Sequence, residues 1–228
     1  MLDLCLRLNN AVDSSQITGS FNSKLEDKIK QINSNIWRTN SVIVVLNTED
    51  VAPLKDISRS WYCFATAITT IHNLIQRLMY LSSDSIMILA PYNAQIRVLL
   101  TLRKGAIKTA NAVNDRKLAK ELNEVMIITV DSSIGKDRPY VILDTVGRDR
   151  GFLWRQPRTL VAGTRARTGF TFVGPTYPYT SSEHIEPDNR LKQMLFSWGS
   201  KKYIVTIPKI KLASFEQYHD VQRTLNAF

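Results

Sequence analysis

The sequence contains few of the residues that form disulfide frameworks and metal centres. Its 228 residues include only two cysteines, Cys5 and Cys63, and three histidines. Two cysteines cannot form a disulfide framework, and this small set contains no cluster with the spacing of zinc ligands. The sequence therefore predicts neither a disulfide-rich module nor a metal centre.

Long apolar runs are also missing. No continuous run approaches the roughly 18 residues that a membrane-spanning helix needs. Near its start the chain carries Asp3, where a secretory signal needs positive charge, and Arg7 interrupts the apolar run that follows. We therefore expect an intracellular protein, in the nucleus or the cytoplasm, that is not secreted and does not bind a membrane.

Positive charge is concentrated in one stretch of the chain. The formal net charge is +10, and residues 96–168 carry 15 Lys or Arg against 7 Asp or Glu. Such an excess indicates a polyanionic partner such as a nucleic acid, although a solvated basic surface would account for it equally well.

Apolar, β-branched runs alternate with amphipathic stretches from residue 41 onward. Runs that lack a polar face are typical of buried parallel strands, and apolar residues at steps of three and four indicate helices. The pattern predicts an α/β fold with a mainly parallel sheet and helices on both faces. Strands are expected at residues 42–46, 85–90, 125–130, 140–146, 170–173 and 203–207, and helices at residues 60–81, 93–103, 110–124, 157–167 and 191–198.

Composition divides the chain into three parts. Residues 1–40 are rich in Asn and Ser and are interpreted as a polar arm or a remnant, ordered or partly disordered, with a short helix over 25–36. Residues 41–207 form the main domain. Residues 208–228 form a C-terminal tail.

Three polar segments adjoin the expected strands. Ligands of parallel sheets bind at the carboxyl ends of strands, so chemistry is expected there. Residues 91–95 (PYNAQ) offer an aromatic ring and an amide, and residues 131–137 (DSSIGKD) combine small hydroxyls, a glycine and a lysine that suit a phosphate. Residues 164–167 (TRAR) place two arginines just before a strand.

Each segment also has a purely structural interpretation. The first fits a capped loop with a half-buried Tyr92, and the second fits a tight, solvated turn. The two arginines of the third need an anionic partner, because an unpaired buried guanidinium costs several kcal/mol. That partner is either an acid of the chain, such as Asp144, or a phosphate supplied from outside, as with an arginine finger.

The order of the three segments is more specific than any one of them. The sequences IMILAPYNAQIRVLL, VMIITVDSSIGKDRPYVILDTV and PRTLVAGTRARTGFTFVG resemble motifs IV, V and VI of superfamily 1 helicases. The likeness is greatest to the group that contains the nonsense-mediated-decay RNA helicase and its replication relatives, and GFLWRQPRTL resembles the segment before motif VI. The resemblance covers residues 41–207. It implies the second, C-terminal RecA-like domain of such a helicase.

The resemblance also implies roles for individual residues. Arg165 would be the arginine finger, supported by Arg167. The residues implied to bind the nucleotide are Tyr92, Gln95, Gly135 and Asp137. Those implied to contact the backbone of single-stranded RNA or DNA, without sequence preference, are Pro91, Thr129, Asp131, Ser132 and Lys136.

Several positions depart from the family pattern. The Phe-Gln pair before the motif V glycine is Ser133-Ile134, and Arg-Glu after it is Lys136-Asp137. Leu160 replaces the motif VI asparagine, Gly163 replaces a bulky apolar residue, and Ile96 replaces an arginine. The shorter carboxylate and the loss of a planar guanidinium weaken the expected nucleotide contacts.

The largest departure is the absence of a G-x-x-x-x-G-K-[ST] loop and of an acidic magnesium-binding motif from the 228 residues. ATP and magnesium are therefore expected only in the context of a first RecA-like domain that these residues do not contain, and ATP hydrolysis is not expected of the chain alone. On this interpretation the chain is a fragment, one piece of a split gene or the product of a truncated gene model, and a Walker A-bearing domain in trans is one way to supply the missing half. Whether the chain acts as an enzyme stays open. The alternative is a degenerate, non-catalytic adaptor that binds nucleic acid or protein. A small-molecule enzyme is disfavoured, because no G-x-G-x-x-G fingerprint is present.

Overall fold

The computed structural model describes residues 21–48, 52–147, 156–176 and 203–207. These residues build a six-stranded sheet in the order β5-β4-β6-β7-β1-β8. Every neighbouring pair of its strands is parallel. The strands are β1 (Ile43–Thr48), β4 (Ile86–Ala90), β5 (Met126–Thr129), β6 (Arg138–Asp144), β7 (Ala166–Gly174) and β8 (Ile204–Ile207).

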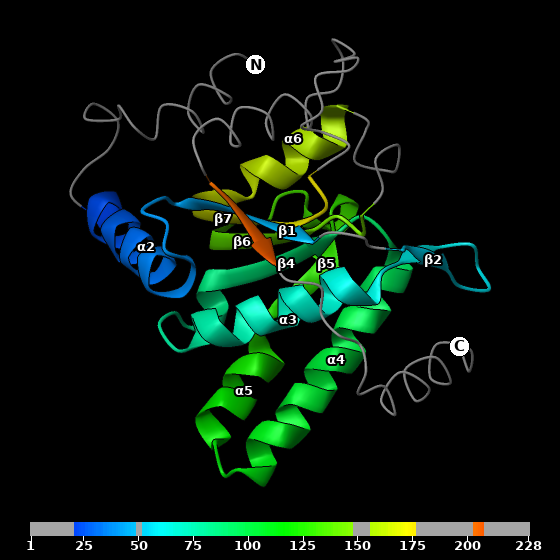
Figure 1. Cartoon of the computed structure of the whole chain (residues 1–228), viewed down its shortest axis with the longest axis horizontal. Coiled ribbons are helices and arrows are strands. Elements are labelled where there is room, and N and C mark those ends of the chain that lie inside the picture. Colours follow the sequence, from blue (N-terminus) through cyan, green and yellow to red (C-terminus); the bar gives the residue numbers. More distant parts are fainter. Residues whose placement is uncertain (1–20, 49–51, 148–155, 177–202, 208–228) are drawn as a thin grey trace.

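Helices cover both faces of this sheet, as Figure 1 shows: α6 lies on one side, and α3, α4 and α5 lie on the other. Their bounds are α2 (Phe21–Trp37), α3 (Phe64–Leu78), α4 (Asn93–Ala112), α5 (Arg116–Glu124) and α6 (Gln156–Thr164). β1 and β4 are buried along their whole length; β4 is apolar throughout, and β1 is apolar up to Leu46 and ends on the buried Asn47 and Thr48. The predicted α/β fold with a parallel sheet is confirmed.

Several boundaries differ from the predicted ones for local reasons. α3 begins at Phe64, because the preceding residues form strand β3 (Trp61–Tyr62), which pairs with β2 (Leu54–Lys55) in a small antiparallel hairpin. α4 runs on to Ala112, and α5 then begins after Asp115, whose carboxylate accepts the backbone N–H of Leu118 at 2.9 Å. α6 ends at Thr164, because β7 starts at Ala166.

α2 contains the predicted short helix over 25–36 and packs into the folded core, so this part of the segment 1–40, interpreted as a polar arm or a remnant, does not project from the domain. Ile29 is fully buried and Ile32 nearly so, although Asn and Ser residues surround them in the sequence. Asn33 is buried as well, and its side-chain amide donates to the carbonyl oxygen of Ser41. Residues 1–20, the predicted helix over 191–198 and the predicted tail over 208–228 lie outside the described residues. The domain limits at residues 40 and 207 stay predictions.

A buried arginine connects α2, α3 and the sheet. Arg77 of α3 is completely buried, and its guanidinium stacks on the Tyr140 ring with 4.1 Å between the guanidinium carbon and the ring centroid. Its Nη2 donates to Asn33 Oδ1 at 2.7 Å and to Thr171 Oγ1 at 3.4 Å. Burial lowers the pKa of Arg77. The cation is thus held by neutral acceptors and an aromatic face rather than by an acid.

Tyr140 has room for its ring only because residue 169 is glycine. A Cβ built on Gly169 would collide with Cδ2 and Cε2 of Tyr140, whereas a Cβ on the exposed Gly105 of α4 would meet nothing within 4 Å. We expect Gly169→Ala to lower the free energy of unfolding by about 1–3 kcal/mol through overpacking. The matched change Gly105→Ala should raise it by up to about 1 kcal/mol, because alanine favours helix. Urea unfolding of both variants measures these values; equal effects would contradict this account of the core.

Candidate functional site

The connection between β5 and β6 passes from the carboxyl ends of the sheet strands back to their amino ends. Both strands flank β4 and run parallel to it, so the chain must return across a face of the sheet. Thr129 at the end of β5 pairs with Ala90, whereas Tyr140 in β6 pairs with Ile86. Residues 130–137, here called the crossover loop, therefore bring groups from the carboxyl ends of the strands to their amino ends.

Hydrogen bonds within the crossover loop fix its first half. The Thr129 hydroxyl accepts from Ser132 N at 3.2 Å and donates to Ser132 Oγ at 2.8 Å. Ser133 donates its hydroxyl to the Val130 carbonyl at 2.6 Å and accepts at its own carbonyl from Lys136 N at 2.9 Å. Gly135 has a φ of 77°, which glycine adopts without the strain other residues incur. Thr129 and Ser132, predicted together as nucleic-acid contacts, do lie together.

Arg165 is held by oxygen atoms of α6 and, more weakly, by carbonyl oxygens of the crossover loop. Its Nε donates to the Val161 carbonyl at 3.1 Å, and its Nη2 donates to Thr164 Oγ1 at 3.0 Å. Its Nη1 makes two longer contacts, 3.5 Å to the Ser133 carbonyl and 3.4 Å to the Lys136 carbonyl. None of the described acids forms an ion pair with Arg165. The guanidinium is oriented, and its charge helps to lower the pKa of the nearby Asp137 without an ion pair between the two.

The alternative partner, Asp144, is engaged elsewhere. Its Oδ2 accepts from Gln95 Nε2 at 2.6 Å and from Thr70 Oγ1 at 3.3 Å, and its Oδ1 accepts from Val146 N at 3.0 Å. Desolvation by complete burial raises the pKa of Asp144 to about 6, although these hydrogen bonds oppose the shift. A structural salt bridge from Arg165 or Arg167 to Asp144 is therefore not the arrangement in this protein.

Further cations gather around the same loop. Arg167 forms an ion pair with Asp137, and Arg158 forms one with Asp131 through Nε and Oδ1 at 3.3 Å. Arg138 donates to the carbonyl of Asp137 at 2.7 Å. These side chains, here called the arginine cluster, comprise Lys136, Arg138, Arg158, Arg165 and Arg167 with Asp131 and Asp137.

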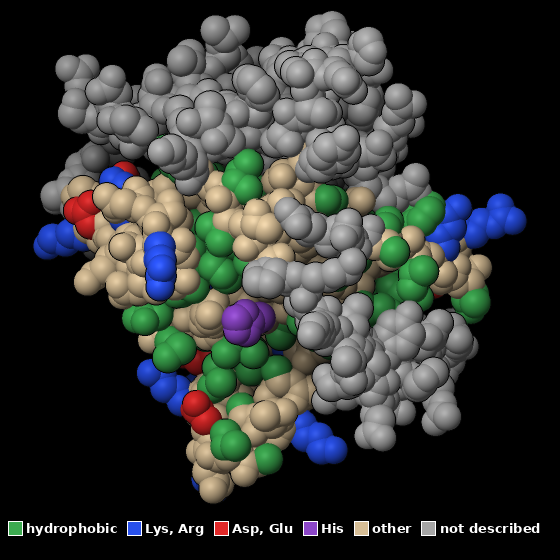
Figure 2. All heavy atoms as spheres, viewed as in Figure 1, with side chains coloured by type: hydrophobic (Ala, Val, Ile, Leu, Met, Phe, Trp, Pro, Cys, Tyr) green, Lys and Arg blue, Asp and Glu red, His purple; other side chains and the backbone are tan. Residues whose placement is uncertain are grey.

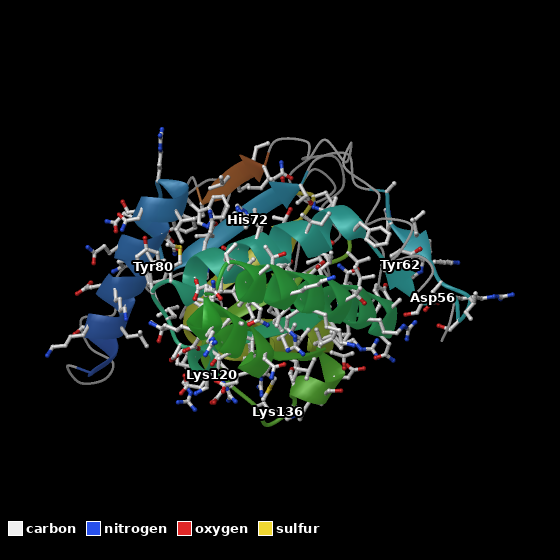
Figure 3. The ribbon with its side chains drawn as sticks, turned by 90° about the horizontal axis from the view of Figure 1, so that it is seen from below. Asp56, Tyr62, His72, Tyr80, Lys120 and Lys136 are labelled. Atoms are coloured by element: carbon white, nitrogen blue, oxygen red, sulfur yellow. The ribbon has the colours of Figure 1, made fainter. Side chains whose placement is uncertain are left out.

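The arginine cluster keeps an excess of positive charge. It contains five cations and two carboxylates, and the hydrogen bond from Arg167 together with the neighbouring arginine charges lowers the pKa of Asp137. Lys136 is exposed on the surface of the molecule (Figure 3). The cluster can therefore attract an anion with several oxygens, such as a polyphosphate.

Gln95 does not face a ligand-accessible surface. The side chain is fully buried; its Oε1 accepts from Cys63 N at 2.8 Å, and its Nε2 donates to the Cys63 carbonyl, to Thr66 Oγ1 and to Asp144. Its polar atoms are thus used inside the protein. Gln95 holds the start of α4 in place, and Tyr92, which is half-buried at the N-cap of α4, takes its position from that helix.

The three predicted segments do not lie at the same ends of the sheet strands. Tyr92 follows the carboxyl end of β4, whereas Arg165 precedes the amino end of β7, where its carbonyl accepts from Arg138 N. Arg165 lies directly before β7, as predicted from the sequence, and so at the opposite end of the strands from Tyr92. The strand ends that carry Tyr92 and Arg165 are separated by about 13 Å or more, at roughly 3.3 Å per residue from Ile86 to Ala90. Only an extended ligand can touch both.

Comparison with known proteins identifies the family. A family model described as an AAA domain matches residues 4–177, which is well over half of the chain. The chain belongs to this AAA-domain family. The domain is found in the C-terminal regions of superfamily 1 helicases, so the chain is a helicase-like domain with the RecA-like fold. A search of curated proteins found no match.

Two further features of the AAA domain concern the described residues only. They contain no group of three or more His, Cys, Asp or Glu side chains that could hold a metal ion. None of the described helices is long and apolar enough to cross a membrane.

Proposed function

We propose that this AAA domain is the C-terminal motor half of a superfamily 1 RNA or DNA helicase. In this proposal a first RecA-like domain, which this sequence does not contain, carries the P-loop and the magnesium ligands, and the arginine cluster completes the nucleotide site. The observation that carries the proposal is the state of Arg165, whose guanidinium is fixed by Val161 and Thr164 and forms no ion pair with any of the described acids.

The geometry of Arg165 suits transfer of its hydrogen bonds to a phosphate. The contacts through Nε and Nη2 hold the plane of the guanidinium, whereas the two Nη1 contacts lie at the long limit of hydrogen bonding. A phosphate oxygen would replace these weak contacts with a charge-assisted bond. Bound ATP supplies the phosphoanhydride that is cleaved; Arg165 would stabilise the charge that develops on the transferred group.

Neighbouring residues would support this role. The ion pair between Arg167 and Asp137 ties the start of β7 to the end of the crossover loop and so limits how far Arg165 can move. Gly135 lets the loop turn between these groups. Thr129, Asp131 and Ser132, at the carboxyl end of β5, would contact the sugar–phosphate backbone of a single strand, with an affinity that falls as salt rises.

One observation favours the adaptor alternative. Ile134 is 70% exposed at the surface of the crossover loop, at the position of the family's polar glutamine. An exposed apolar side chain there is unfavourable for contact with a charged nucleotide and favourable for contact with another protein. A non-catalytic adaptor would retain the fold and the basic surface without taking part in hydrolysis.

ATPase measurements distinguish the two functions. The chain alone should hydrolyse ATP at no meaningful rate, because it contains no cradle for the β- and γ-phosphates. Titrating the chain into a Walker A-bearing first domain of a superfamily 1 helicase should raise the rate until it saturates. A rate that never responds to the chain would support the adaptor, and rapid hydrolysis by the chain alone would contradict the proposal.

A further inference from the structure

The β2–β3 hairpin projects from the body of the molecule. Figure 1 shows β2 at one extremity, and Figure 3 shows Asp56 of the hairpin in a different region from Lys136 of the arginine cluster. The hairpin is short, with Leu54 paired to Tyr62 and Lys55 paired to Trp61. It is thus a separate feature of the surface and lies outside the proposed nucleotide site.

The hairpin is rigid although it projects. Asp56 lies under its turn with only 2% of its side chain exposed, and accepts from Ser58 Oγ at 2.7 Å and from Ser60 N at 2.8 Å. The same carboxylate forms an ion pair with Arg97 of α4. The turn is closed by backbone bonds between Asp56 and Ser60 and from Arg59 to Asp56.

The base of the hairpin is joined to the loop that carries Tyr92. Ala94 N, in the first turn of α4, donates to Ser60 Oγ at 3.1 Å, and Gln95 binds both backbone groups of Cys63. These contacts place the hairpin beside the carboxyl end of β4. At this carboxyl end of the strands the resemblance implies nucleic-acid contacts through Pro91.

The hairpin combines exposed cations with a half-buried aromatic ring. Lys55 Nζ lies 4.6 Å from the centroid of the Trp61 ring, and Arg59 is exposed at the turn. Ile57 is 72% exposed beside them. The one acid of the hairpin, Asp56, has a buried side chain paired with Arg97, so the exposed charges of residues 54–62 are those of Lys55 and Arg59. Figure 2 shows Lys and Arg side chains at this projecting end, next to apolar ones.

We propose that the β2–β3 hairpin is a binding site for single-stranded nucleic acid. An unpaired base stacks on the Trp61 indole, Lys55 moves from the ring to the adjacent phosphate, and Arg59 binds a second phosphate. An aromatic face flanked by cations recognises a strand in this way without reading its sequence. The nucleic-acid partner rests on the proposed function, whereas the site itself is distinct from the arginine cluster.

Charge favours a nucleic acid over a protein as the occupant. A protein surface would have to supply acids for Lys55 and Arg59 and an apolar hollow for Ile57, whereas a polynucleotide supplies phosphates and bases at regular spacing. The rigid turn also means that little conformational freedom is lost on binding, since Asp56 already fixes the backbone.

The test is the salt dependence of binding to a labelled single-stranded oligonucleotide, measured with RNA and with DNA. For Lys55→Ala/Arg59→Ala, the slope of log affinity against log salt should become less steep by about 1.4, because each phosphate contact contributes about 0.7 on a single strand. The matched control is Lys108→Ala/Arg116→Ala, which removes two exposed cations from α4 and α5 and should leave most of the slope intact.

Trp61 provides an independent measurement. Trp61→Leu should weaken binding by about 5- to 150-fold without changing the salt slope, and Trp61→Tyr should restore most of the affinity, because a tyrosine ring still stacks. Thermal unfolding of each variant checks that the fold is retained, and a Trp61→Leu variant that unfolds would leave the salt-slope comparison to decide.

Three results would overturn the hairpin site. The first is a wild-type chain that binds no single-stranded nucleic acid even at low salt. The second is an equal loss of the salt-dependence slope in the hairpin and control variants. The third is a set of hairpin variants that bind nucleic acid normally but lose a protein partner. None of these results bears on the arginine cluster, which is tested by ATPase stimulation. Conversely, the wild-type chain could fail to stimulate ATPase while Lys55→Ala/Arg59→Ala still reduces the salt slope. That outcome would support the hairpin site and contradict the proposed nucleotide role.

Discussion

Arg165→Ala should abolish stimulation of ATP hydrolysis in the mixture of this chain with a Walker A-bearing first domain. An arginine that stabilises the transferring phosphoryl group contributes about 10³- to 10⁵-fold to kcat, and the neighbouring Arg167 is already paired with Asp137. Steady-state ATPase rates at saturating chain and saturating ATP measure the effect. The fall should appear in kcat, because the interaction strengthens in the transition state.

Two control variants separate catalysis from structure at this position. Arg165→Lys keeps the charge but loses the planar fork, so it should recover only a small part of the rate. Arg116→Ala removes an exposed arginine from α5 and should leave kcat unchanged. Arg165 also contacts the carbonyls of Ser133 and Lys136, so the free energy of unfolding of each variant must be measured. A normal rate in a folded Arg165→Ala variant would exclude the arginine-finger role.

The buried carboxyl group of Asp144 should make the stability of this domain fall between about pH 4 and pH 7. Its pKa is raised from 3.8 to about 6 in the folded state, so the folded protein binds the proton more tightly than the unfolded chain. The contribution is fully present below about pH 4 and is lost as the pH rises through about 6. A shift of this size corresponds to about 3 kcal/mol of unfolding free energy.

Comparison with Asp144→Asn isolates this contribution, because the amide does not titrate. Urea unfolding at several pH values should show the stability of the wild type falling relative to Asp144→Asn by about 3 kcal/mol from pH 4 to pH 7. Asp84→Asn, which removes an exposed carboxylate, is the matched control. Groups whose pKa is lowered, such as Asp56 and Glu121, act at lower pH and in the opposite direction. A difference that is constant with pH would contradict the assignment.

The sheet could be predicted from the sequence because its strands are buried on both faces. Runs such as Val42–Leu46 and Ile86–Ala90 have no polar face, and the helices between them show clear three- and four-residue spacing. The length of α2 and its packing against the core were not predicted. Only a few apolar residues, including Ile29 and Ile32, reach the core from a segment otherwise rich in Asn and Ser. Burial of so few side chains leaves a weak periodic signal.

The sequence placed Arg165 directly before the strand that is β7, but it could not show which groups meet the side chain there. The contacts of Arg165 with the Ser133 and Lys136 carbonyls depend on how the crossover loop returns across the sheet. That path is set by the pairing of Thr129 with Ala90 and of Tyr140 with Ile86, which no local pattern encodes. Asp144 was considered only as a salt-bridge partner of the arginines. Its position directly after the apolar residues 141–143 of its strand also makes it a candidate for burial.

The hairpin illustrates a second limit. Its strands are two residues long, so alternation of polar and apolar residues cannot be recognised, and Trp61 and Tyr62 were assigned to the start of a helix. The turn depends on Asp56, whose role becomes visible only when Arg97 of the distant helix α4 is placed beside it. Side chains that act through long-range contacts escape prediction from local sequence.

The most direct test of the nucleotide role is the NMR signal of the Arg165 side-chain Nε–H in this chain assembled with a Walker A-bearing first domain. The signal is assigned by its loss in Arg165→Lys. A non-hydrolysable ATP analogue should shift it, because the guanidinium then donates to a phosphate, while AMP should leave it unchanged. A signal that stays in place while the analogue is bound would show that Arg165 does not meet the triphosphate, and the motor-half account would be wrong.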